Sequence, residues 1–409
     1  MKQKNTNIKT NGEFNFKKDF PILKNICYLD NSATTQKPIS VISRMTKIYL
    51  EENANSHSGV YDLSEKTAKN LQLARDEFAN FINAKSEEII FTRNATDSFN
   101  LLAELLEEKI KKGNNIISTE IEHHSNFVLW QQLSFKKNAE FVVAKYNKLD
   151  ELISPEKLVN KNTAIVSFSL MSNVSGLIPD AQNIIKEIRK KNKNTIIIVD
   201  ATQAAAHIKI DVVKLDCDFL CFSAHKIYGP TGVGILYGKK ELLENLEPKR
   251  YGGGMIRTVS KDKSTWANLP DKLESGTSSA EAIICAANAI NYLNKKDVAK
   301  LFLKENELKK YALQELKKIK GISIIGHKKS NHGPVISFTM REIHPHDVAE
   351  ICARKNVCIR AGHHCAQPFH ESLGIVASSR ISISFYNDKT DIDKFIIAIN
   401  DVNKIMRIK

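Results

Sequence analysis

The sequence lacks the features that mark membrane-spanning and secreted proteins. No stretch of the 409 residues approaches the roughly 18 consecutive apolar residues that a membrane-spanning helix needs. Residues 1–10 are polar and rich in Lys and Asn, without the apolar centre of a secretory signal. We therefore expect a cytoplasmic protein with no membrane partner.

Cysteine patterns typical of metal sites and redox dithiols are also missing. The seven cysteines are odd in number, and no two of them have C-x-x-C spacing. In a cytoplasmic chain most of them should be reduced and buried as small apolar residues. We expect no metal site, and only Cys365 has unusual sequence neighbours.

The chain has no acidic excess, because its 60 Lys and Arg outnumber its 46 Asp and Glu and give a net charge of +14. Such a charge invites a nucleic-acid partner. The basic residues are scattered, however, as in Lys111-Lys112 and Lys190-Lys191, with no basic run interleaved with aromatics. Nucleic acid is not an expected partner, and a non-catalytic RNA-binding or scaffold protein is kept only as a rival.

What the sequence does contain is a regular alternation of apolar runs with helical patterns. Near-continuous apolar strands separated by helices predict an α/β fold with a mainly parallel sheet that helices cover on both faces. The predicted strands are 26–29, 88–92, 115–118, 140–143, 163–169, 195–199, 219–222 and 233–237, with helices at 38–52, 64–82, 95–112, 126–137 and 180–191.

A smaller α+β domain is predicted after a Gly-rich, polar stretch at 251–277, since a chain this long favours two domains. We expect an N-terminal arm (1–25) that packs with the small domain, a large domain (26–296) and the small domain (297–409). The predicted elements of this second region are helices at 280–293, 295–319, 346–355 and 391–405, strands at 322–325, 334–338 and 381–385, and a loop at 360–369.

Lys226 stands directly after the apolar run 219–222, in Ser223-Ala224-His225-Lys226, and before the Gly/Pro-rich break at 229–234. A lysine fixed at a strand end suits an amine held against a small ligand, for example as a Schiff base. A surface lysine in a turn is the alternative. Lys226 alone does not decide between them.

Three other strand ends carry polar residues, where ligands bind in open α/β sheets. Asp200 follows four aliphatic residues and needs a partner such as a protonated pyridine nitrogen, with Gln203 close by, although backbone amides or an Arg would also satisfy it. Thr96 opens a helix whose free N–H groups could hold a phosphate, or Asn94 and Thr96 are a plain cap. His123 could stack on a ring or carry protons, with a metal ligand as its alternative. A phosphate, an aldehyde and a ring nitrogen together describe pyridoxal phosphate.

The reaction is indicated by Arg360-Ala361-Gly362-His363-His364-Cys365 in the second region. Basic neighbours favour the thiolate, which is the nucleophilic form of cysteine, and Gly362 and Pro368 bracket it as a loop. Buried structural cysteine is the alternative. Arg380, before the strand predicted at 381–385, could clamp a substrate carboxylate, or could form a surface ion pair.

With these residues in view, the chain resembles the group II cysteine desulfurases of the SufS/CsdA type, in the class V branch of the fold-type I aminotransferases. The resemblance runs from about residue 28 to the C-terminal end. Its most specific stretches are Tyr28-Leu29-Asp30-Asn31-Ser32-Ala33, Glu122-His123-His124-Ser125-Asn126, Asp200-Ala201-Thr202-Gln203-Ala204, Ser223-Ala224-His225-Lys226-Ile227-Tyr228-Gly229-Pro230 and Arg360-Ala361-Gly362-His363-His364-Cys365.

The resemblance implies a role for each matched residue. The catalytic residues would be Lys226, which bonds to the cofactor aldehyde and moves the substrate Cα proton, Cys365, which takes the sulfur as a persulfide, and His123. The implied cofactor-binding residues are Lys226, Thr96, His123, Asp200, Gln203, Ser223, His225 and, from the second subunit of a homodimer, Thr277. The implied substrate-binding residues are Asn173, Arg380, Arg360 and His57.

The implied reaction converts L-cysteine to L-alanine. An acceptor protein of the SufE/SufU kind would then take the persulfide sulfur for iron–sulfur cluster assembly. A selenocysteine lyase or another class V aminotransferase is the alternative within the same cofactor class. An aminotransferase would not need Cys365, whereas L-selenocysteine would use the same clamp as L-cysteine.

Overall fold

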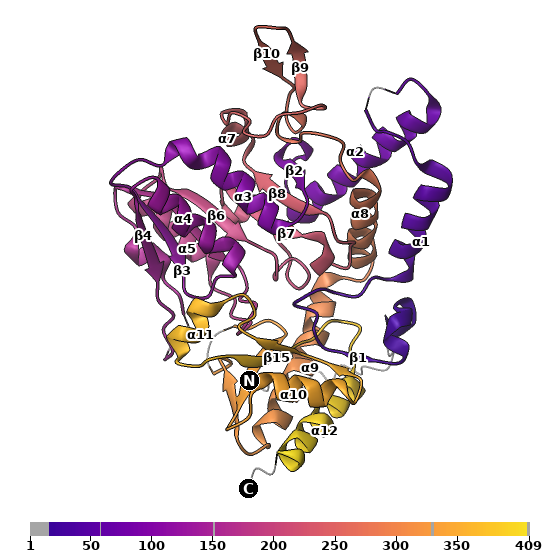
Figure 1. The fold of residues 1–409 in the computed structure, drawn as a ribbon, viewed down its shortest axis with the longest axis vertical. Coiled ribbons are helices and arrows are strands. Elements are labelled where there is room, and N and C mark those ends of the chain that lie inside the picture. Colours follow the sequence, from indigo (N-terminus) through magenta and orange to yellow (C-terminus); the bar gives the residue numbers. More distant parts are fainter. Residues whose placement is uncertain (1–15, 58, 150–151, 329–330, 407–409) are drawn as a thin grey trace, which may run out of the picture.

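Two bodies are stacked along the long axis of the molecule, each built on its own β-sheet (Figure 1). The computed structural model describes residues 16–57, 59–149, 152–328 and 331–406. The upper body in Figure 1 contains a seven-stranded sheet and the lower body a four-stranded one. Within the described ranges, no helix is both long enough and apolar enough to cross a membrane.

The seven-stranded sheet has the strand order β2-β8-β7-β6-β5-β3-β4. β8 is antiparallel to its neighbours β2 and β7, whereas the other pairs are parallel. The short connection from β7 to β8 suits this arrangement, because a parallel crossover needs about a dozen residues or more. The predicted α/β class with a mainly parallel sheet is confirmed. The strands are β2 (Ile89–Thr92), β3 (Asn115–Thr119), β4 (Glu140–Ala144), β5 (Thr163–Ser169), β6 (Ile196–Asp200), β7 (Phe219–Ser223) and β8 (Gly234–Gly238).

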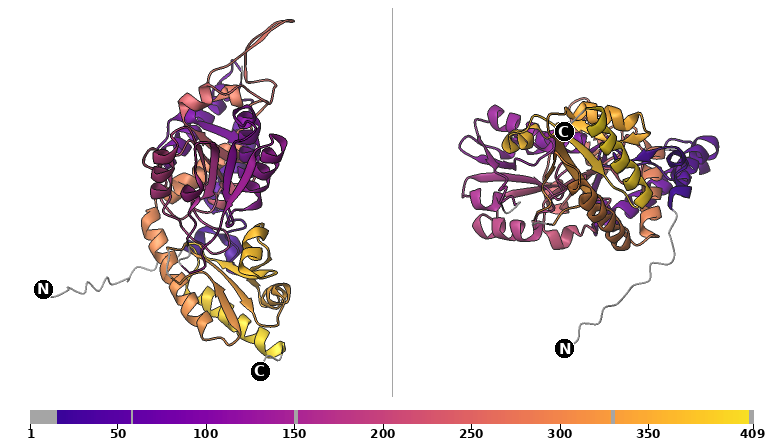
Figure 2. Two further views of the ribbon diagram at one scale, coloured as in Figure 1. Left: turned by 90° about the vertical axis from the view of Figure 1, so that its left-hand side faces the viewer. Right: turned by 90° about the horizontal axis from the view of Figure 1, so that it is seen from below.

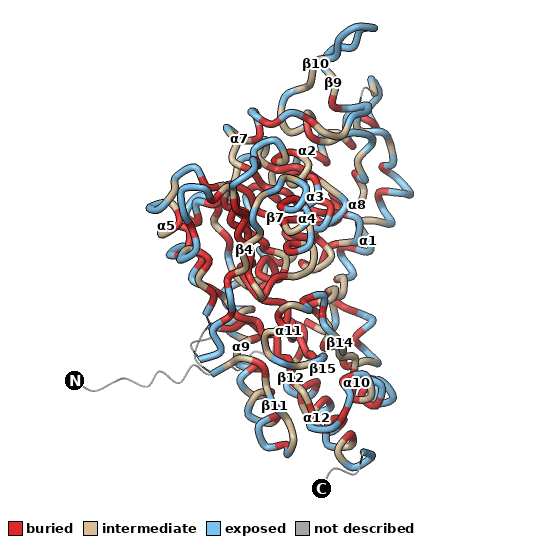
Figure 3. Tube along the Cα trace, turned by 60° about the vertical axis from the view of Figure 1, so that its left-hand side comes forward, coloured by how far each residue is buried: buried red, intermediate tan, exposed pale blue. Residues whose placement is uncertain are grey.

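Helices cover both faces of this sheet, so alternate residues of one strand enter different apolar cores. In β6, Ile197 and Val199 join one core and Ile198 joins the other. Burial on both faces explains why the strand sequence is an unbroken aliphatic run. In Figure 3 these strands form the red centre of the upper body. The first core includes side chains of α2 (Asp62–Ile82), α5 (Ala181–Lys191) and α8 (Ala280–Asn294), and the second those of α3 (Ala95–Leu106) and α4 (Val128–Lys136).

The lower body is built on an antiparallel sheet of order β11-β12-β15-β14. Its helices enclose a separate apolar core with one face of the sheet. Figure 2 shows the orange segment of α8 and α9 passing from the upper body to the lower one. The elements are β11 (Ile322–Ile325), β12 (Val335–Met340), β14 (Arg360–Gly362), β15 (Ser378–Ser382), α9 (Val298–Lys317), α10 (Pro345–Ala353), α11 (Gln367–Leu373) and α12 (Lys389–Ile405).

The described part of the predicted N-terminal arm contacts both bodies. Phe20 is fully buried and packs edge-on against Tyr292 of the upper body and Phe385 of the lower one. Lys17 pairs with Asp388 at 2.8 Å and with Asp391 at 2.9 Å. Residues 1–15 lie outside the described residues. The domain limits at 25/26 and 296/297 stay a prediction.

Several predicted element boundaries are wrong, because the local sequence does not show where these helices end or where an exposed hairpin forms. The helix expected at 95–112 ends at Leu106, and the helix expected at 38–52 divides into α1 (Ile39–Lys47) and a π-helical turn (Ile48–Glu52). The polar stretch 251–277 contains a hairpin of β9 (Ile256–Val259) and β10 (Ser264–Trp266), which is largely exposed and so lacks an apolar signal. Besides several short 3-10 helices, the other short elements are β1 (Cys27–Tyr28), β13 (Val357–Cys358), α6 (Val212–Leu215) and α7 (Lys240–Glu244).

The segment around the predicted loop 360–369 also differs. β14 occupies its first residues, α11 begins at Gln367, and the last strand is Ser378–Ser382 rather than 381–385. This strand is rich in serine, which resembles a loop in sequence. Its buried hydroxyls find partners, however: Ser378 Oγ lies 3.0 Å from His364 Nε2 and 2.9 Å from His370 Nε2.

Candidate active site

Lys226 lies at the carboxyl edge of the large sheet, in a turn of 3-10 helix that directly follows β7. Burial lowers the pKa of its amine to about 8, and the negative charge of Asp200 acts in the opposite direction. The Lys226 amine has no hydrogen-bond partner among the residues that the structure describes. The site therefore holds an amine that is partly unprotonated near neutral pH and free to react.

Asp200 is the last residue of β6 and is buried beside Lys226. The backbone N–H of Thr202 donates to its Oδ1 at 2.8 Å. Burial raises the pKa of this carboxyl group, while that hydrogen bond and the charge of Lys226 lower it. Gln203 donates from Nε2 to Ser32 O at 2.9 Å, which leaves its second amide N–H for another acceptor. A buried carboxylate with so few donors suits a cationic partner.

His123 follows β3 and lies close enough to Lys226 to feel its charge. Its Nδ1 accepts a hydrogen bond from the backbone N–H of Ser125 at 3.1 Å, so the ring proton sits on Nε2. Burial, with the positive charge of Lys226, lowers the pKa of His123 to about 3. The side chain is thus a neutral imidazole that offers an N–H donor.

A third group of polar residues surrounds the start of α3. Ser223 Oγ accepts from the backbone N–H of Ala95 at 2.7 Å, and Thr96 Oγ1 lies 2.7 Å from Ser125 Oγ. His225, one residue before Lys226, contacts Thr34 Oγ1 through Nδ1 at 3.2 Å. Gly234 makes this approach possible, because a Cβ at that position would lie 2.4 Å from the Asn94 carbonyl carbon. The hydroxyls and the helix N-terminus suit a phosphate.

Arg380 in β15 brings a buried guanidinium from the small sheet to the same edge. It donates to Asn173 O at 2.9 Å and to Asp30 Oδ1 at 3.1 Å. Its Nε is buried without a hydrogen-bond partner in the part of the chain that is described. Arg360 is half exposed, with its guanidinium 3.7 Å from Asp30. The Asn173 side chain donates to His364 O at 2.6 Å. The unpaired Arg380 Nε is a ready donor for a ligand carboxylate.

Cys365 is exposed and lies on the loop between β14 and α11. Both His364 (φ 54°) and Cys365 (φ 55°) have left-handed backbone conformations, which non-glycine residues adopt only under local constraint. The constraint comes from His124, whose N–H donates to Cys365 O at 2.7 Å and whose Nε2 accepts from the N–H of Gln367 at 3.1 Å. The Cys365 thiol is close enough to interact electrostatically with Lys226 and Arg380. The structure therefore brings the predicted nucleophile to the predicted cofactor lysine.

Two predicted site residues lie apart from the others in this chain. Thr277 is exposed beside Gly276, and His57 is exposed in the loop before α2. Among the described residues, neither side chain contacts the site residues above, as expected for Thr277, which would act on a second subunit. The implied role of Thr277 across a dimer interface stays a prediction, and so does the implied role of His57.

The sequence interpretation gave no role to three residues that contact the site: Asp30, Ser125 and Glu122. Glu122 is fully buried after β3, and burial raises its pKa to about 7 while hydrogen bonds from Ser169, Thr119 and Asn126 oppose the rise. A usable signal was present, because Glu122 follows a buried strand just as Asp200 does. Asp30 also directly follows a predicted strand, but its pairing with Arg380, 350 residues away, could not be inferred from the sequence.

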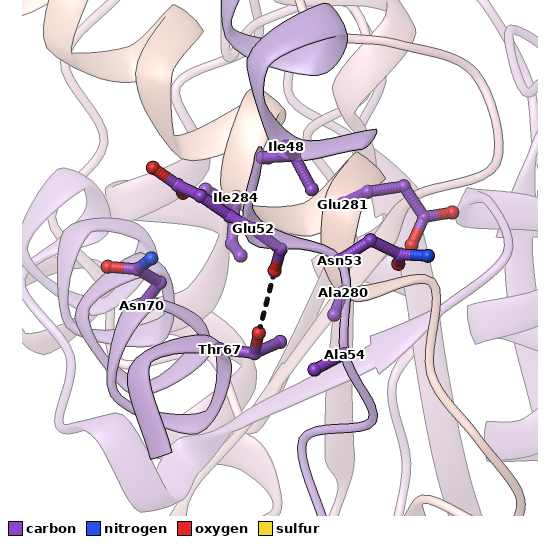
Figure 4. A pocket seen from close by; sticks show the side chains of 9 residues that line it. All are labelled: Ile48, Glu52, Asn53, Ala54, Thr67, Asn70, Ala280, Glu281 and Ile284. Carbon is purple, nitrogen blue, oxygen red and sulfur yellow. Dashed lines mark hydrogen bonds between the residues drawn. The ribbon is translucent and has the colours of Figure 1, made fainter. Parts of the chain in front are cut away.

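A small cavity elsewhere does not belong to this site. It has a volume of about 20 Å³ and lies between the π-helical turn, α2 and the start of α8 (Figure 4). Its size fits roughly one water molecule, and none of the predicted site residues lines it. Over the described ranges, no cluster of three or more His, Cys, Asp or Glu side chains could hold a metal.

Comparisons with known proteins agree with the geometry. The family model described as Aminotransferase class-V matches residues 27–395. Probable cysteine desulfurases of Staphylococcus epidermidis and Staphylococcus aureus are each 41% identical to this chain over 397 residues, which cover 95% of it and 96% of each of them.

Solved structures extend the likeness to the backbone. The cysteine desulfurase of Thermococcus onnurineus NA1 superposes with a TM-score of 0.91 at 33% identity, covering 95% of this chain and 97% of that one. The cysteine desulfurase CsdA of Escherichia coli gives 0.88 at 31% identity, covering 95% and 98%.

The fold and the site together define a fold-type I enzyme that depends on pyridoxal phosphate. The residues present fit this cofactor. The buried Lys226 amine, which has no hydrogen-bond partner among the described residues, can bond to the cofactor aldehyde, and the buried Asp200 carboxylate can pair with the protonated ring nitrogen. More narrowly, the chain belongs to the class V aminotransferase family, among its cysteine desulfurases.

Proposed function

We propose that this protein takes sulfur from L-cysteine, releases L-alanine and holds the sulfur as a persulfide on Cys365. One observation carries the proposal: the exposed Cys365 thiol lies within electrostatic range of both Lys226 and Arg380. A reacting thiol beside a cofactor lysine and a carboxylate clamp is what desulfuration needs and what simple transamination does not.

In this proposal the large sheet holds the cofactor. When bound, pyridoxal phosphate supplies an electron sink for negative charge that develops on the substrate. Lys226 would hold the cofactor through its aldehyde and would carry the proton of the substrate Cα, which its buried amine suits. Asp200 would pair with the ring nitrogen, Gln203 would bind the ring hydroxyl, and the neutral His123 ring, a donor at Nε2, would lie against the pyridine. Thr96, Ser223 and His225 would hold the phosphate, with Thr277 of a second subunit.

The substrate is oriented from the small sheet. Its carboxylate binds the free Nε edge of Arg380, with Asn173 beside it, and Arg360 adds a weaker contact, while a role for His57 rests on the family resemblance alone. The Cys365 thiolate attacks the substrate sulfur, so a new S–S bond forms as the C–S bond breaks. The electron pair of the broken bond stays with the substrate carbon, which protonation converts to the methyl group of alanine.

A homodimer completes the proposed site. Large apolar side chains on α1, the π-helical turn and the start of α2 are solvent-exposed in the single chain, which suits a subunit interface. They are Ile39, Ile42, Tyr49, Leu50, Tyr61 and Leu63. In Figure 1 these elements lie on the right-hand side of the upper body. The interface would bring Thr277 to the partner's phosphate.

The persulfide is the form in which the sulfur leaves. Because Cys365 is exposed, a partner thiol can reach it, and we propose an acceptor protein of the SufE/SufU kind in the cytoplasm, with iron–sulfur cluster assembly as the destination. L-selenocysteine would fit the same clamp and is tested alongside L-cysteine.

The test is incubation of the purified, cofactor-loaded protein with L-cysteine. We expect alanine in step with one added sulfur atom on the peptide that contains Cys365. Cys365→Ser should retain the cofactor absorbance and lose alanine formation. Cys358→Ser is the matched control, because Cys358 is half-buried and should change little. Alanine formation at an undiminished rate in Cys365→Ser would refute the proposed role of this thiol.

A further inference from the structure

Residues 122–126, which we call the His123 segment, contact three parts of the site at once. His123 lies within electrostatic range of Lys226, and Ser125 Oγ lies 2.7 Å from Thr96 Oγ1 at the start of α3. Between them, His124 holds the nucleophile loop through Cys365 O and the N–H of Gln367. Any shift of this segment would move the cofactor end and the nucleophile end of the site together.

The segment is anchored from below by Glu122, which is completely buried. Its Oε1 accepts from Thr119 Oγ1 at 2.6 Å and from the backbone N–H of Ser169 at 3.0 Å. Its Oε2 accepts from Asn126 Nδ2 at 2.7 Å and from Ser169 Oγ. Each oxygen thus takes one hydroxyl that can rotate and one N–H donor that cannot.

The Asn126 donor is fixed by the residue beneath it. Trp130 Nε1 donates to Asn126 Oδ1 at 3.0 Å, and an indole nitrogen can only donate. The amide of Asn126 therefore cannot flip, and its Nδ2 must face Glu122. The Ser169 N–H is equally fixed, because it is part of the backbone.

Ser169 connects Glu122 to Asp200. The two residues are register partners in the parallel pair of β5 and β6, and the N–H of the next residue, Leu170, donates to Asp200 O at 2.9 Å. Glu122 thus holds both the end of β5 that abuts Asp200 and the segment that carries His123. None of its hydrogen-bond partners is a predicted cofactor-binding or substrate-binding residue.

We propose that Glu122 is a positioning residue that fixes the His123 segment to the end of β5. It thereby fixes the position of the Cys365 loop relative to the cofactor-binding residues. The inference deepens the proposed function and rests on it for the roles of Lys226 and Cys365. The hydrogen-bond arrangement that carries it is independent of that function.

Glu122→Gln is the sharpest substitution, because it keeps the size of the side chain but makes one of its two acceptors a donor. A carboxamide has one oxygen and one NH2, so it can satisfy either the Ser169 N–H or Asn126 Nδ2, but not both. The other fixed donor would then face an amide N–H in a buried place, which is unfavourable. The segment should loosen while the surrounding core stays packed.

Glu120→Gln is the matched control. Glu120 lies two residues earlier, is half-buried, and accepts from the Tyr146 N–H at 2.8 Å, outside the hydrogen bonds of Glu122. Both variants and the wild type are compared for kcat, for the affinity of the apoenzyme for pyridoxal phosphate by absorbance titration, and for amide hydrogen exchange of the peptides around residues 119–127 and 363–373.

For Glu122→Gln we expect kcat to fall on the order of 10- to 100-fold through misplacement of the reacting groups. Cofactor affinity should weaken about tenfold, as for one buried unsatisfied donor. Exchange should accelerate in the two site peptides but not in β12, which separates local loosening from general destabilisation. Glu120→Gln should match the wild type in all three measurements.

Wild-type levels of cofactor affinity and of local exchange in Glu122→Gln would overturn the proposal. If that variant does not fold, Thr119→Val takes its place, since it removes one rotatable donor without adding a conflicting one, and it should shift the same readouts by a smaller amount. No shift in Thr119→Val would then count against the proposal. If the wild type itself makes no alanine, the proposed function fails. The pyridoxal phosphate affinity and the amide hydrogen exchange of the variants would still test the positioning role of Glu122.

Discussion

Lys226 and Cys365 meet in one site but are held in opposite ways. Lys226 follows a buried strand directly, and its surroundings come from strand ends and the first turn of α3. Cys365 lies on an exposed loop of the small sheet, where two successive residues have left-handed backbones that contacts from His124 stabilise.

The difference follows from what each group has to do. An amine becomes nucleophilic near neutral pH when burial disfavours its charged form, so Lys226 needs an enclosed and rigid setting. A thiol that takes sulfur inside the site and passes it to another protein must be reachable from solvent. In the proposed function, buried Lys226 holds the cofactor and exposed Cys365 carries the sulfur atom.

The strongest test of this contrast is removal of the buried amine. Lys226→Ala should lower alanine formation by on the order of 10⁴-fold or more, because both the covalent attachment and the proton carrier are lost. Cofactor absorbance after gel filtration and alanine release measure the two losses. Lys136→Ala, in an exposed ion pair with Glu107, is the control and should be unchanged. Retained activity in Lys226→Ala would end the assignment of this lysine.

A second test concerns the clamp between the two groups. Arg380→Lys keeps the charge but cannot reproduce the planar fork that reaches Asp30 and Asn173 while its Nε faces a ligand. We expect kcat/KM for L-cysteine to fall about 10- to 100-fold, mainly through KM, as for one or two charged hydrogen bonds. Unchanged KM with unchanged cofactor binding would show that the carboxylate binds elsewhere.

A third test uses pH. The unprotonated amine attacks the cofactor aldehyde, so the reconstitution rate of the apoenzyme should rise with pH and level off above about 8, where the Lys226 pKa lies. The rate at one pH unit below that pKa should be about tenfold lower than the plateau. Free N-acetyl-lysine, as a control, should keep accelerating to much higher pH. A reconstitution rate that rises like that of the free amine would mean that burial does not activate Lys226.

Much of the upper body was predictable because its strands can be recognised from short, local stretches of sequence. A parallel sheet buried on both faces requires continuous aliphatic strands, such as Ile196-Ile197-Ile198-Val199, and ligand groups gather where these strands end. Lys226, Asp200 and His123 could thus be placed at one edge from sequence alone. The SufS/CsdA resemblance supplied the chemistry that strand positions could not.

The lower body was harder to predict because the interactions that stabilise it join residues far apart in the sequence. The hydroxyls that make β15 resemble a loop are satisfied by histidines from the neighbouring loop and α11, and Arg380 meets Asp30 across 350 residues. The position of Glu122 after a strand signals a buried carboxylate, as for Asp200, but it does not reveal which four donors surround it. Such pairings are set by the tertiary fold.

The smallest effect is expected for Arg360, which we compare with Arg380, the second arginine beside the proposed carboxylate site. Arg360 and Arg380 are direct partners in the antiparallel pair of β14 and β15, where like charges normally oppose each other. Asp30 lies close to both, at 3.7 Å and 3.1 Å, and offsets the repulsion. The Arg360 side chain is 54% exposed and that of Arg380 only 3%, so water already screens most of the interaction of Arg360.

Arg360→Ala should therefore lower kcat/KM only about two- to fivefold, as for a solvent-exposed ion pair, and that small loss should shrink further at high salt. The buried member of the pair should lose far more under the same steady-state assay with L-cysteine. Equal losses in Arg360→Ala and Arg380→Lys would mean that Arg360 binds the substrate directly when the site closes. In that case the exposed loop would contribute specificity as well as the thiol, and the division between a buried cofactor end and an exposed sulfur-carrying end would have to be redrawn at Arg360.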